Sequence, residues 1–225
     1  MSKEKKAADK KKLRAKYLEK RNRLDFKKRR IASERIKAKA FETKQFTNAE
    51  TVFVYAAYKS EVETMELIKG ALRRGKRVAV PKVDGTEMEF YEITSWEELF
   101  PGFSGILEPQ IHDKTPVIPK DSDVFIVPGA VFDLAGRRIG YGAGYYDRYW
   151  NKVNSTYGVN PRFMALSFEC QICRGGVPSE KHDKKMDCII TERRVIMPKN
   201  DDYGKWDIIL DIAEGVIELV LELID

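Results

Sequence analysis

Apolar residues near the N-terminus recur at the spacing of an amphipathic helix. From residue 11 to about residue 46 there is no Gly or Pro, and the polar face is Lys and Arg. This pattern predicts one or two basic helices, with a break near residues 22–25 or at Ser33. We expect the apolar stripe to dock on the rest of the protein. The stripe consists of Leu13, Tyr17, Leu24, Phe26, Ile31, Ile36, Ala40 and Phe41.

Beyond residue 50, β-rich segments alternate with helical ones, which predicts an α/β layered domain with a largely parallel sheet. Residues 123–127 are almost wholly apolar, as is typical of a strand covered on both faces. Pro81 is expected to end the second strand. The predicted strands are residues 51–55, 76–80, 88–93, 123–127, 163–168 and 188–190, and the predicted helices are residues 63–74, 145–153 and 206–223.

The length of 225 residues suits one large domain, which we place over residues 1–225 with a basic helical arm at 1–46 and a C-terminal helix at 200–225. Hydrophobic residues make up 43% and charged residues 34%, which excludes a collagen-like or wholly disordered chain. Four carboxylates interrupt the apolar stretch Ile208 to Ile224, so no membrane span is expected. The N-terminus lacks the apolar segment of a secretory leader, and a cytoplasmic location is predicted.

The three cysteines, Cys170, Cys173 and Cys188, are too few for a disulfide framework and favour a reducing compartment. The Cys170–Cys173 pair has the spacing of half a zinc site or a redox motif. Because no second ligand pair follows at a standard spacing, two small core thiols are the favoured interpretation.

The net charge of +6 is unevenly distributed. The first 40 residues contain 18 Lys and Arg against 5 Asp and Glu, whereas the remainder is acidic overall. Such an arm can bind nucleic acid, clamp a phosphate or form a solvated helix.

A glycine-rich loop between a predicted strand and a predicted helix carries the strongest chemical signal. Gly140, Gly142 and Gly144 alternate, which lets the backbone approach a ligand and present N–H groups. The following helix N-terminus favours anions. Arg137, Arg138 and Arg148 flank the loop and Asp147 lies in the first helical turn, where it could hold a divalent ion that bridges phosphates. The spacing matches neither a Walker loop nor the dinucleotide fingerprint, and a flexible surface turn is the alternative to a phosphate site.

The loop resembles the signature of the 5-formyltetrahydrofolate cyclo-ligase family, and further family motifs follow one another in order over about residues 10–190. The matching segments are Lys10 with Leu13-Arg14, Tyr55 with residues 61–64, residues 75–81, residues 105–109, Pro128-Gly129, Phe132-Asp133, residues 136–148, and His182-Asp183 with Asp187.

The resemblance implies a Rossmann-like three-layer α/β/α fold and an ATP-dependent enzyme that converts 5-formyltetrahydrofolate to 5,10-methenyltetrahydrofolate. It implies Mg²⁺ at Asp147 and Asp187, with Asp183 as an alternative second ligand, and catalytic roles for Arg138, Tyr145 and Arg148. By the same resemblance, Ala56, Glu61, Tyr141, Gly142, Ala143, Gly144 and Tyr145 bind the folate, and Lys10, Lys11, Lys12, Leu13, Arg14, Arg138, Ile139, Gly140, Tyr141, Gly142, Ala143, Gly144, Tyr145 and Tyr146 bind ATP.

The expected partners are therefore the two small molecules, with no nucleic acid and no membrane, and the protein is expected to be a monomer. Two other function classes stay open at this point. The basic arm could bind nucleic acid, although it lacks the interleaved aromatics of RNA-binding segments. The chain could also be an inactive family member used as a scaffold, although the intact loop, Asp147 and Glu61 argue against this.

Overall fold

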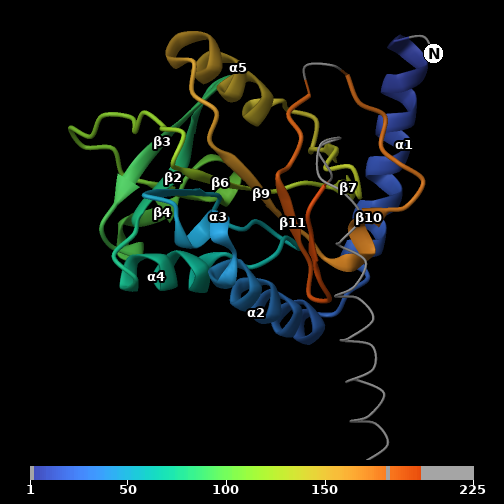
Figure 1. Ribbon diagram of the computed structural model, residues 1–225, viewed down its shortest axis with the longest axis horizontal. Coiled ribbons are helices and arrows are strands. Elements are labelled where there is room, and N and C mark those ends of the chain that lie inside the picture. The colour runs from blue at the N-terminus through green and yellow to red at the C-terminus, as the bar shows by residue number, and fades with distance from the viewer. Residues whose placement is uncertain (1–2, 181–182, 199–225) are drawn as a thin grey trace, which may run out of the picture.

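A seven-stranded sheet forms the centre of the computed structural model, which describes residues 3–180 and 183–198 (Figure 1). Its strand order is β12-β11-β9-β6-β1-β2-β3. The five inner strands run parallel, and β3 and β12 are antiparallel edges. The predicted α/β class with a largely parallel sheet is therefore confirmed. The strands are β1 (Thr51–Val54), β2 (Arg77–Asp84), β3 (Glu87–Ile93), β6 (Val124–Val127), β9 (Arg162–Leu166), β11 (Cys188–Ile190) and β12 (Val195–Ile196).

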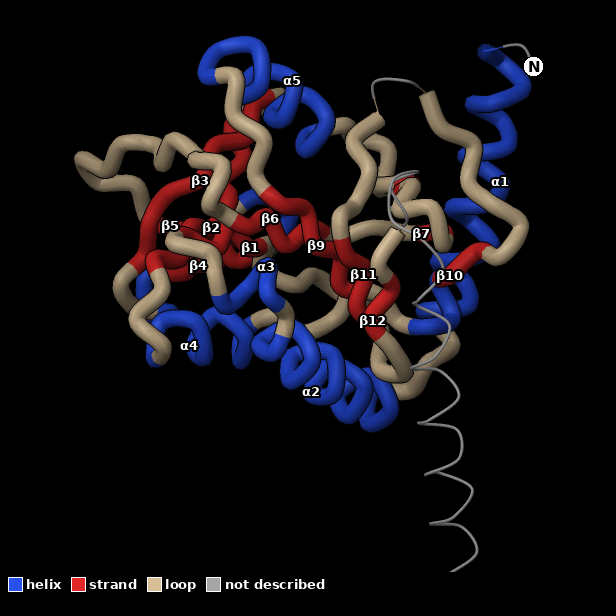
Figure 2. Tube along the Cα trace, in the orientation of Figure 1, coloured by secondary structure: helices blue, strands red, loops and turns tan. Residues whose placement is uncertain are grey.

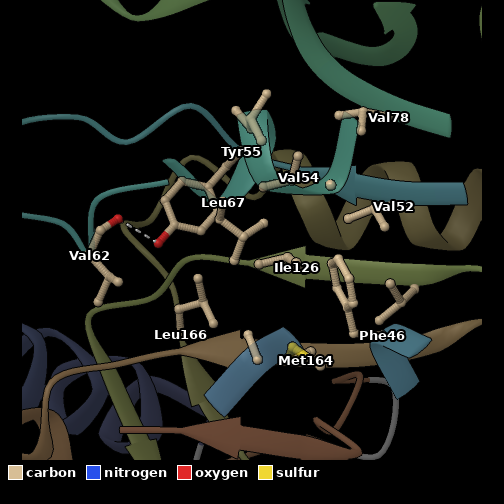
Figure 3. Packing of buried hydrophobic residues seen from close by; sticks show 14 of the residues in the cluster. Phe46, Val52, Val54, Tyr55, Val62, Leu67, Val78, Ile126, Met164 and Leu166 are labelled. Carbon is tan, nitrogen blue, oxygen red and sulfur yellow. Dashed lines mark hydrogen bonds between the residues drawn. The ribbon is translucent and has the colours of Figure 1, made fainter. Parts of the chain in front are cut away.

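Helices cover both faces of the sheet. On one face lie α2 (Phe26–Glu42), α3 (Lys44–Thr47) and α4 (Met65–Arg73), and on the other lies α5 (Tyr145–Tyr157) (Figure 1). Because side chains alternate along a strand, Val52 and Val54 of β1 pack in the cluster with α2 to α4 (Figure 3), whereas Phe53 packs in the cluster with α5. This alternation gives the three layers that the family resemblance implied.

The N-terminal helices break at one of the two predicted places. Helix α1 (Lys3–Asn22) ends before residues 23–25, and Asp25 caps α2 by accepting a hydrogen bond from Lys28 N at 2.9 Å. The prediction that the apolar stripe docks on the rest of the protein is only partly correct, because Phe26 and Ile31 are 67% and 45% exposed. Helix α2 buries the part of the stripe formed by Ile36 and Ala40, together with Ser33.

The prediction that Pro81 ends a strand is wrong, because β2 continues to Asp84. Strand β1 pairs with β2 only up to Ala79, and from there β2 is bonded on one side, to β3. Proline lacks an N–H donor, and this one-sided stretch does not need one.

Two small sheets lie outside the central one and were not predicted. One consists of β7 (Val131–Asp133), β8 (Arg138–Ile139) and β10 (Ile172–Cys173), and the other of β4 (Leu99–Pro101) and β5 (Leu107–Pro109). Helix α1 lies beside β7 and β10 (Figure 2), where Tyr17 is buried against Val131 and Cys173. Three short 3₁₀ helices are η1 (Trp96–Glu98), η2 (Phe103–Gly105) and η3 (Glu169–Gln171).

The remaining predictions concern the C-terminus, the cysteines and the membrane. The helix predicted at residues 206–223 and the motif residue His182 lie outside the described residues. Cys173 and Cys188 are buried free thiols, and Cys170 is half-buried. Burial raises the pKa of the Cys188 thiol to about 12, so it is protonated at neutral pH. Across residues 3–180 and 183–198, no helix has the length and apolarity needed to cross a bilayer.

Candidate active site

A cavity of about 610 Å³ opens at the carboxyl ends of β1 and β6, the neighbouring strands from which the sheet order runs in opposite directions. Tyr55 and Ala56 follow β1, and Pro128 follows β6; all three line the cavity. Ligands of open α/β sheets bind at this kind of position, because the loops diverge there and leave a crevice. Helix α1 closes the opposite side with Lys10, Arg14 and Arg21.

The glycine loop forms one wall of the cavity, and every residue from Gly140 to Asp147 contributes to it. Gly142 and Gly144 have φ values of +111° and +71°, a region that side-chain-bearing residues rarely adopt. Gly144 is also the residue that precedes α5, and the first three residues of this 13-residue helix line the cavity. The predicted strand–glycine-loop–helix arrangement is confirmed.

Cations from two segments, α1 and β8, lie beside this loop. Arg14 donates its Nε–H to the Gly140 carbonyl at 2.7 Å, and a Cβ at position 142 would lie 3.5 Å from its guanidinium. One helical turn earlier, Lys10 pairs with Asp183 at 2.9 Å. Arg138 donates to the Pro128 carbonyl at 3.2 Å and to Asp147 at 3.0 Å. This end of the cavity is suited to a polyanion.

The cavity wall also contains a buried carboxylate, Glu61, which is 8% exposed. Desolvation raises the pKa of Glu61, and hydrogen bonds from the Tyr141 side chain and from the backbone of Tyr58 offset part of that rise. The Tyr58 N–H lies 2.8 Å from Glu61 Oε2. Tyr141 in turn accepts a bond from Arg21 at 2.6 Å, and Arg21 also donates to Ser60 at 3.0 Å. Glu61 is thus held in place while it faces the cavity.

Residues 6–192 match the model of the 5-formyltetrahydrofolate cyclo-ligase family. The chain belongs to this family. It is an enzyme of the ligase class, as the family name states, and its folate chemistry belongs to one-carbon metabolism.

Relatives of the cyclo-ligase support the assignment. This chain is 33% identical over 155 residues to 5-formyltetrahydrofolate cyclo-ligase of Mus musculus, and the alignment covers 66% of this chain and 76% of the mouse protein. It is 31% identical over 184 residues to the mitochondrial enzyme of Arabidopsis thaliana, covering 72% of this chain and 66% of that one. The NMR structure of Aquifex aeolicus 5,10-methenyltetrahydrofolate synthetase shares 31% identity and a TM-score of 0.74, covering 88% of this chain and 97% of that chain.

The cyclo-ligase cavity brings together most of the residues predicted from sequence. They include the predicted phosphate-binding cations and the predicted folate-binding carboxylate. The predicted residues that line it are Lys10, Arg14, Ala56, Glu61, Arg138, Ile139, Gly140, Tyr141, Gly142, Ala143, Gly144, Tyr145, Tyr146 and Asp147.

Five predicted residues lie outside the cavity wall. Lys11 and Lys12 are exposed on α1, and Leu13 packs against the small sheet of β7, β8 and β10. Arg148 instead holds the loop, donating to the Ala143 carbonyl at 2.7 Å and to the Thr86 carbonyl at 2.9 Å. Asp187 accepts hydrogen bonds from Arg162 at 3.3 Å and from Phe163 N at 2.8 Å. Their assigned roles stay predictions.

Arg21 is a cavity residue that the sequence reasoning missed, although a signal was present. It follows Lys10 and Arg14 at helical spacing on α1, so all three share one face of that helix. It is only 5% exposed, which is rare for an arginine and reflects its bonds to Ser60 and Tyr141.

Proposed function

We propose that this cyclo-ligase converts 5-formyltetrahydrofolate and ATP to 5,10-methenyltetrahydrofolate, ADP and phosphate. The observation that carries the proposal is that one cavity combines two kinds of binding group. Its cations and its glycine loop at a helix N-terminus suit a triphosphate, and its buried carboxylate suits the N–H donors of a pterin. A cytoplasmic monomer that acts on these two small molecules is part of the same proposal.

The chemical problem is that an amide-like formyl oxygen is a poor leaving group. In the proposed reaction this oxygen attacks the γ-phosphorus of ATP, an O–P bond forms, and the bond to the β-phosphate oxygen breaks to release ADP. N10 then attacks the formyl carbon, the C–O bond breaks, and phosphate leaves with the former formyl oxygen while N10 loses its proton. Catalysis of such a transfer consists largely of positioning and charge neutralisation.

The proposed scheme gives the cavity residues separate roles. Lys10, Arg14 and the N–H groups of residues 140–146 bind the phosphates, and Arg138 neutralises charge on the transferring phosphoryl group. Ala56, Glu61 and Tyr141 hold the pterin. Tyr145 donates its hydroxyl to the Gly85 carbonyl at 3.1 Å, and with Arg148 it fastens the loop to the β2–β3 turn.

The carboxylates at the cavity suit an Mg²⁺ ion that is also bound to the phosphates of ATP. Mg²⁺ usually takes one or two carboxylates and completes its shell with phosphates and water. Asp147 lies at the cavity wall with a 56% exposed side chain, and Asp183 lines the same cavity. Asp147 would hold the ion, with Asp183 or Asp187 as the second carboxylate. When bound, Mg²⁺ supplies positive charge to the phosphates.

Replacing Asp147 by Asn is expected to raise the Mg²⁺ concentration needed for half-maximal activity about tenfold, because one charge-assisted contact is lost. The thermal midpoint should change little, since the Asp147 side chain is 56% exposed and solvent limits its ion pair with Arg138 to at most about 1 kcal/mol. Magnesium titration of activity measures the first effect and calorimetric melting the second. An unchanged magnesium requirement would remove Asp147 from the metal site.

The double variant Lys10→Ala, Arg14→Ala is expected to raise the apparent KM for ATP about tenfold or more, with little effect on the KM for folate. The two residues lie at i and i+4 on α1, so they share one face of the helix, and both line the cavity. The matched control is Lys11→Ala, Lys12→Ala, which removes two exposed charges from the same helix. Equal effects of the two double variants would show that only the general charge of α1 matters.

Isotope transfer tests the proposed route of the formyl oxygen. With 5-formyltetrahydrofolate labelled with ¹⁸O in the formyl group, the label should appear in inorganic phosphate, at one labelled oxygen per phosphate released. Label that appears in water instead would mean that the oxygen is not phosphorylated. Mass spectrometry of the phosphate distinguishes the two results.

Nucleic-acid binding is the second candidate function, favoured only by the exposed cations of α1 and α2. A titration with mixed RNA and DNA at several salt concentrations separates the two functions. Tight binding that falls steeply with salt, without folate turnover, would favour nucleic acid.

A further inference from the structure

A second buried carboxylate, Glu108 of β5, lies in the cavity wall and was given no role above. It is only 5% exposed. Its Oε1 accepts a hydrogen bond from Val83 N at 3.3 Å, and its Oε2 lies 3.5 Å from Lys82 Nζ. Both distances exceed the usual 2.7–3.2 Å of an N–H···O bond. A carboxylate can accept about four hydrogen bonds, so Glu108 keeps strong acceptor capacity at a buried site.

The position of Glu108 is set by the ion pair with Lys82, by the bond from Val83 N and by close packing at Gly102. A Cβ at position 102 would overlap the Glu108 carboxylate, so the absence of a side chain at Gly102 allows the carboxylate to lie where it does. Gly102 N–H donates to the Ile106 carbonyl at 2.7 Å, which ties down the turn between β4 and β5. The carboxylate is therefore held before any ligand arrives.

The surroundings of Glu108 select the kind of ligand group. Val83, Met88 and Ile106 line the cavity near it and make this part of the wall apolar. A flat heterocycle fits such a wall, and a hydrogen bond to a carboxylate is stronger where water is excluded. An anionic carboxylate accepts only, so the ligand must present a donor.

We propose that Glu108 accepts a hydrogen bond from N8–H of the reduced pterin ring and thereby selects reduced over oxidised folates. This inference rests on the proposed function. Glu61, which enters the cavity from the loop after β1, takes the paired donors N3–H and the 2-amino group, present in both oxidation states. Glu108 lies on β5 beside β2, so it enters the cavity from a different element than Glu61 and would meet a different donor of the ring. N8 carries hydrogen in tetrahydrofolates but not in fully oxidised folate, and N5 carries the formyl group.

Calorimetric titration with 5-formyltetrahydrofolate and with folic acid tests the assignment. Glu108→Gln is expected to weaken binding of 5-formyltetrahydrofolate about 10- to 100-fold and to leave folic acid nearly unchanged. Glu61→Gln, the matched comparison, is expected to weaken both ligands to a similar extent. Equal loss for both ligands in Glu108→Gln, or no loss for either, would overturn the proposal.

A second variant guards against a general effect of substituting a buried charge. Gly102 lies outside the cavity lining and has no positive φ, so Gly102→Ala displaces the Glu108 carboxylate without backbone strain at position 102. It should show the same selective loss for 5-formyltetrahydrofolate, while binding of a non-hydrolysable ATP analogue, which reports a folded cavity, is kept. Unaltered selectivity in Gly102→Ala would contradict the assignment. If the parent protein itself fails to bind 5-formyltetrahydrofolate, the proposed function fails; if only the variants behave differently from expectation, this inference alone fails.

Discussion

Replacing Arg138 by Met is expected to lower kcat about 100- to 1000-fold, the effect of removing one preorganised donor from a charged transition state. The Arg138 side chain is 9% exposed and is oriented by the Pro128 carbonyl and Asp147. Methionine keeps much of its volume but has no charge. Single-turnover measurement of methenyltetrahydrofolate formation should locate the loss in the chemical step rather than in binding.

The neighbouring residue provides the control for this variant. Arg137 is 39% exposed and lies 3.7 Å from Asp133, and it does not line the main cavity. Asp133 also accepts bonds from the N–H groups of Ala135, Arg137 and Val177, so it stays satisfied without the Arg137 side chain. Arg137→Met should therefore keep most of the activity. A comparable loss in both variants would mean that Arg138 has no special role in the transfer.

Replacing Glu61 by Gln is expected to weaken 5-formyltetrahydrofolate binding about 10- to 150-fold, since a charge-assisted hydrogen bond contributes about 1.5–3 kcal/mol. Glutamine keeps the shape, loses the charge and turns an amide N–H₂ toward a donor. Affinity for an ATP analogue alone should stay nearly unchanged, because the proposed phosphate contacts come from Lys10, Arg14 and Arg138 and not from Glu61. Calorimetric titration of each ligand separately measures both. A matching fall in ATP affinity would show that Glu61 does not anchor the pterin.

The pH dependence of folate binding follows from the raised pKa of Glu61. The ionised carboxylate accepts the pterin donors, so affinity should fall as pH is lowered through that raised pKa, above the ordinary 4.5. Protein stability changes in the opposite sense. The raised pKa favours the folded state fully below the unfolded pKa, and this contribution is lost as pH rises through the folded pKa. In Glu61→Gln both dependences should disappear, as pH-resolved titration and melting can show.

The central strands and α5 could be predicted because their signals are local. Residues 124–127 are uniformly apolar because helices cover both faces of β6, and α5 begins at the residue after Gly144. The small sheets β7–β8–β10 and β4–β5 could not be predicted in this way, because strands of two or three residues have no detectable period. The prediction for Pro81 was wrong because a proline in the sequence shows only that one N–H donor is missing. The sequence does not show that β1 stops pairing with β2 before this residue, so that no donor is needed there.

The site residues also differ in how far the sequence could predict them. The glycine loop and Glu61 carry specific motifs, and the structure places them in one cavity. Arg21 had only the signal of its spacing from Lys10 and Arg14, and Glu108 only its place in the motif at residues 105–109; tertiary packing brings both into that cavity. Asp187 has a suitable type and motif, but its carboxylate bonds Arg162 and Phe163 N, which sequence spacing cannot reveal.

Formation of 5,10-methenyltetrahydrofolate, followed by its absorbance, tests the central claim most directly. With 5-formyltetrahydrofolate, ATP and Mg²⁺ together, the product should accumulate with one ADP released per molecule formed. Omission of any one of the three should abolish the signal. Product formed at the same rate without ATP, or ATP consumed without product, would contradict the account.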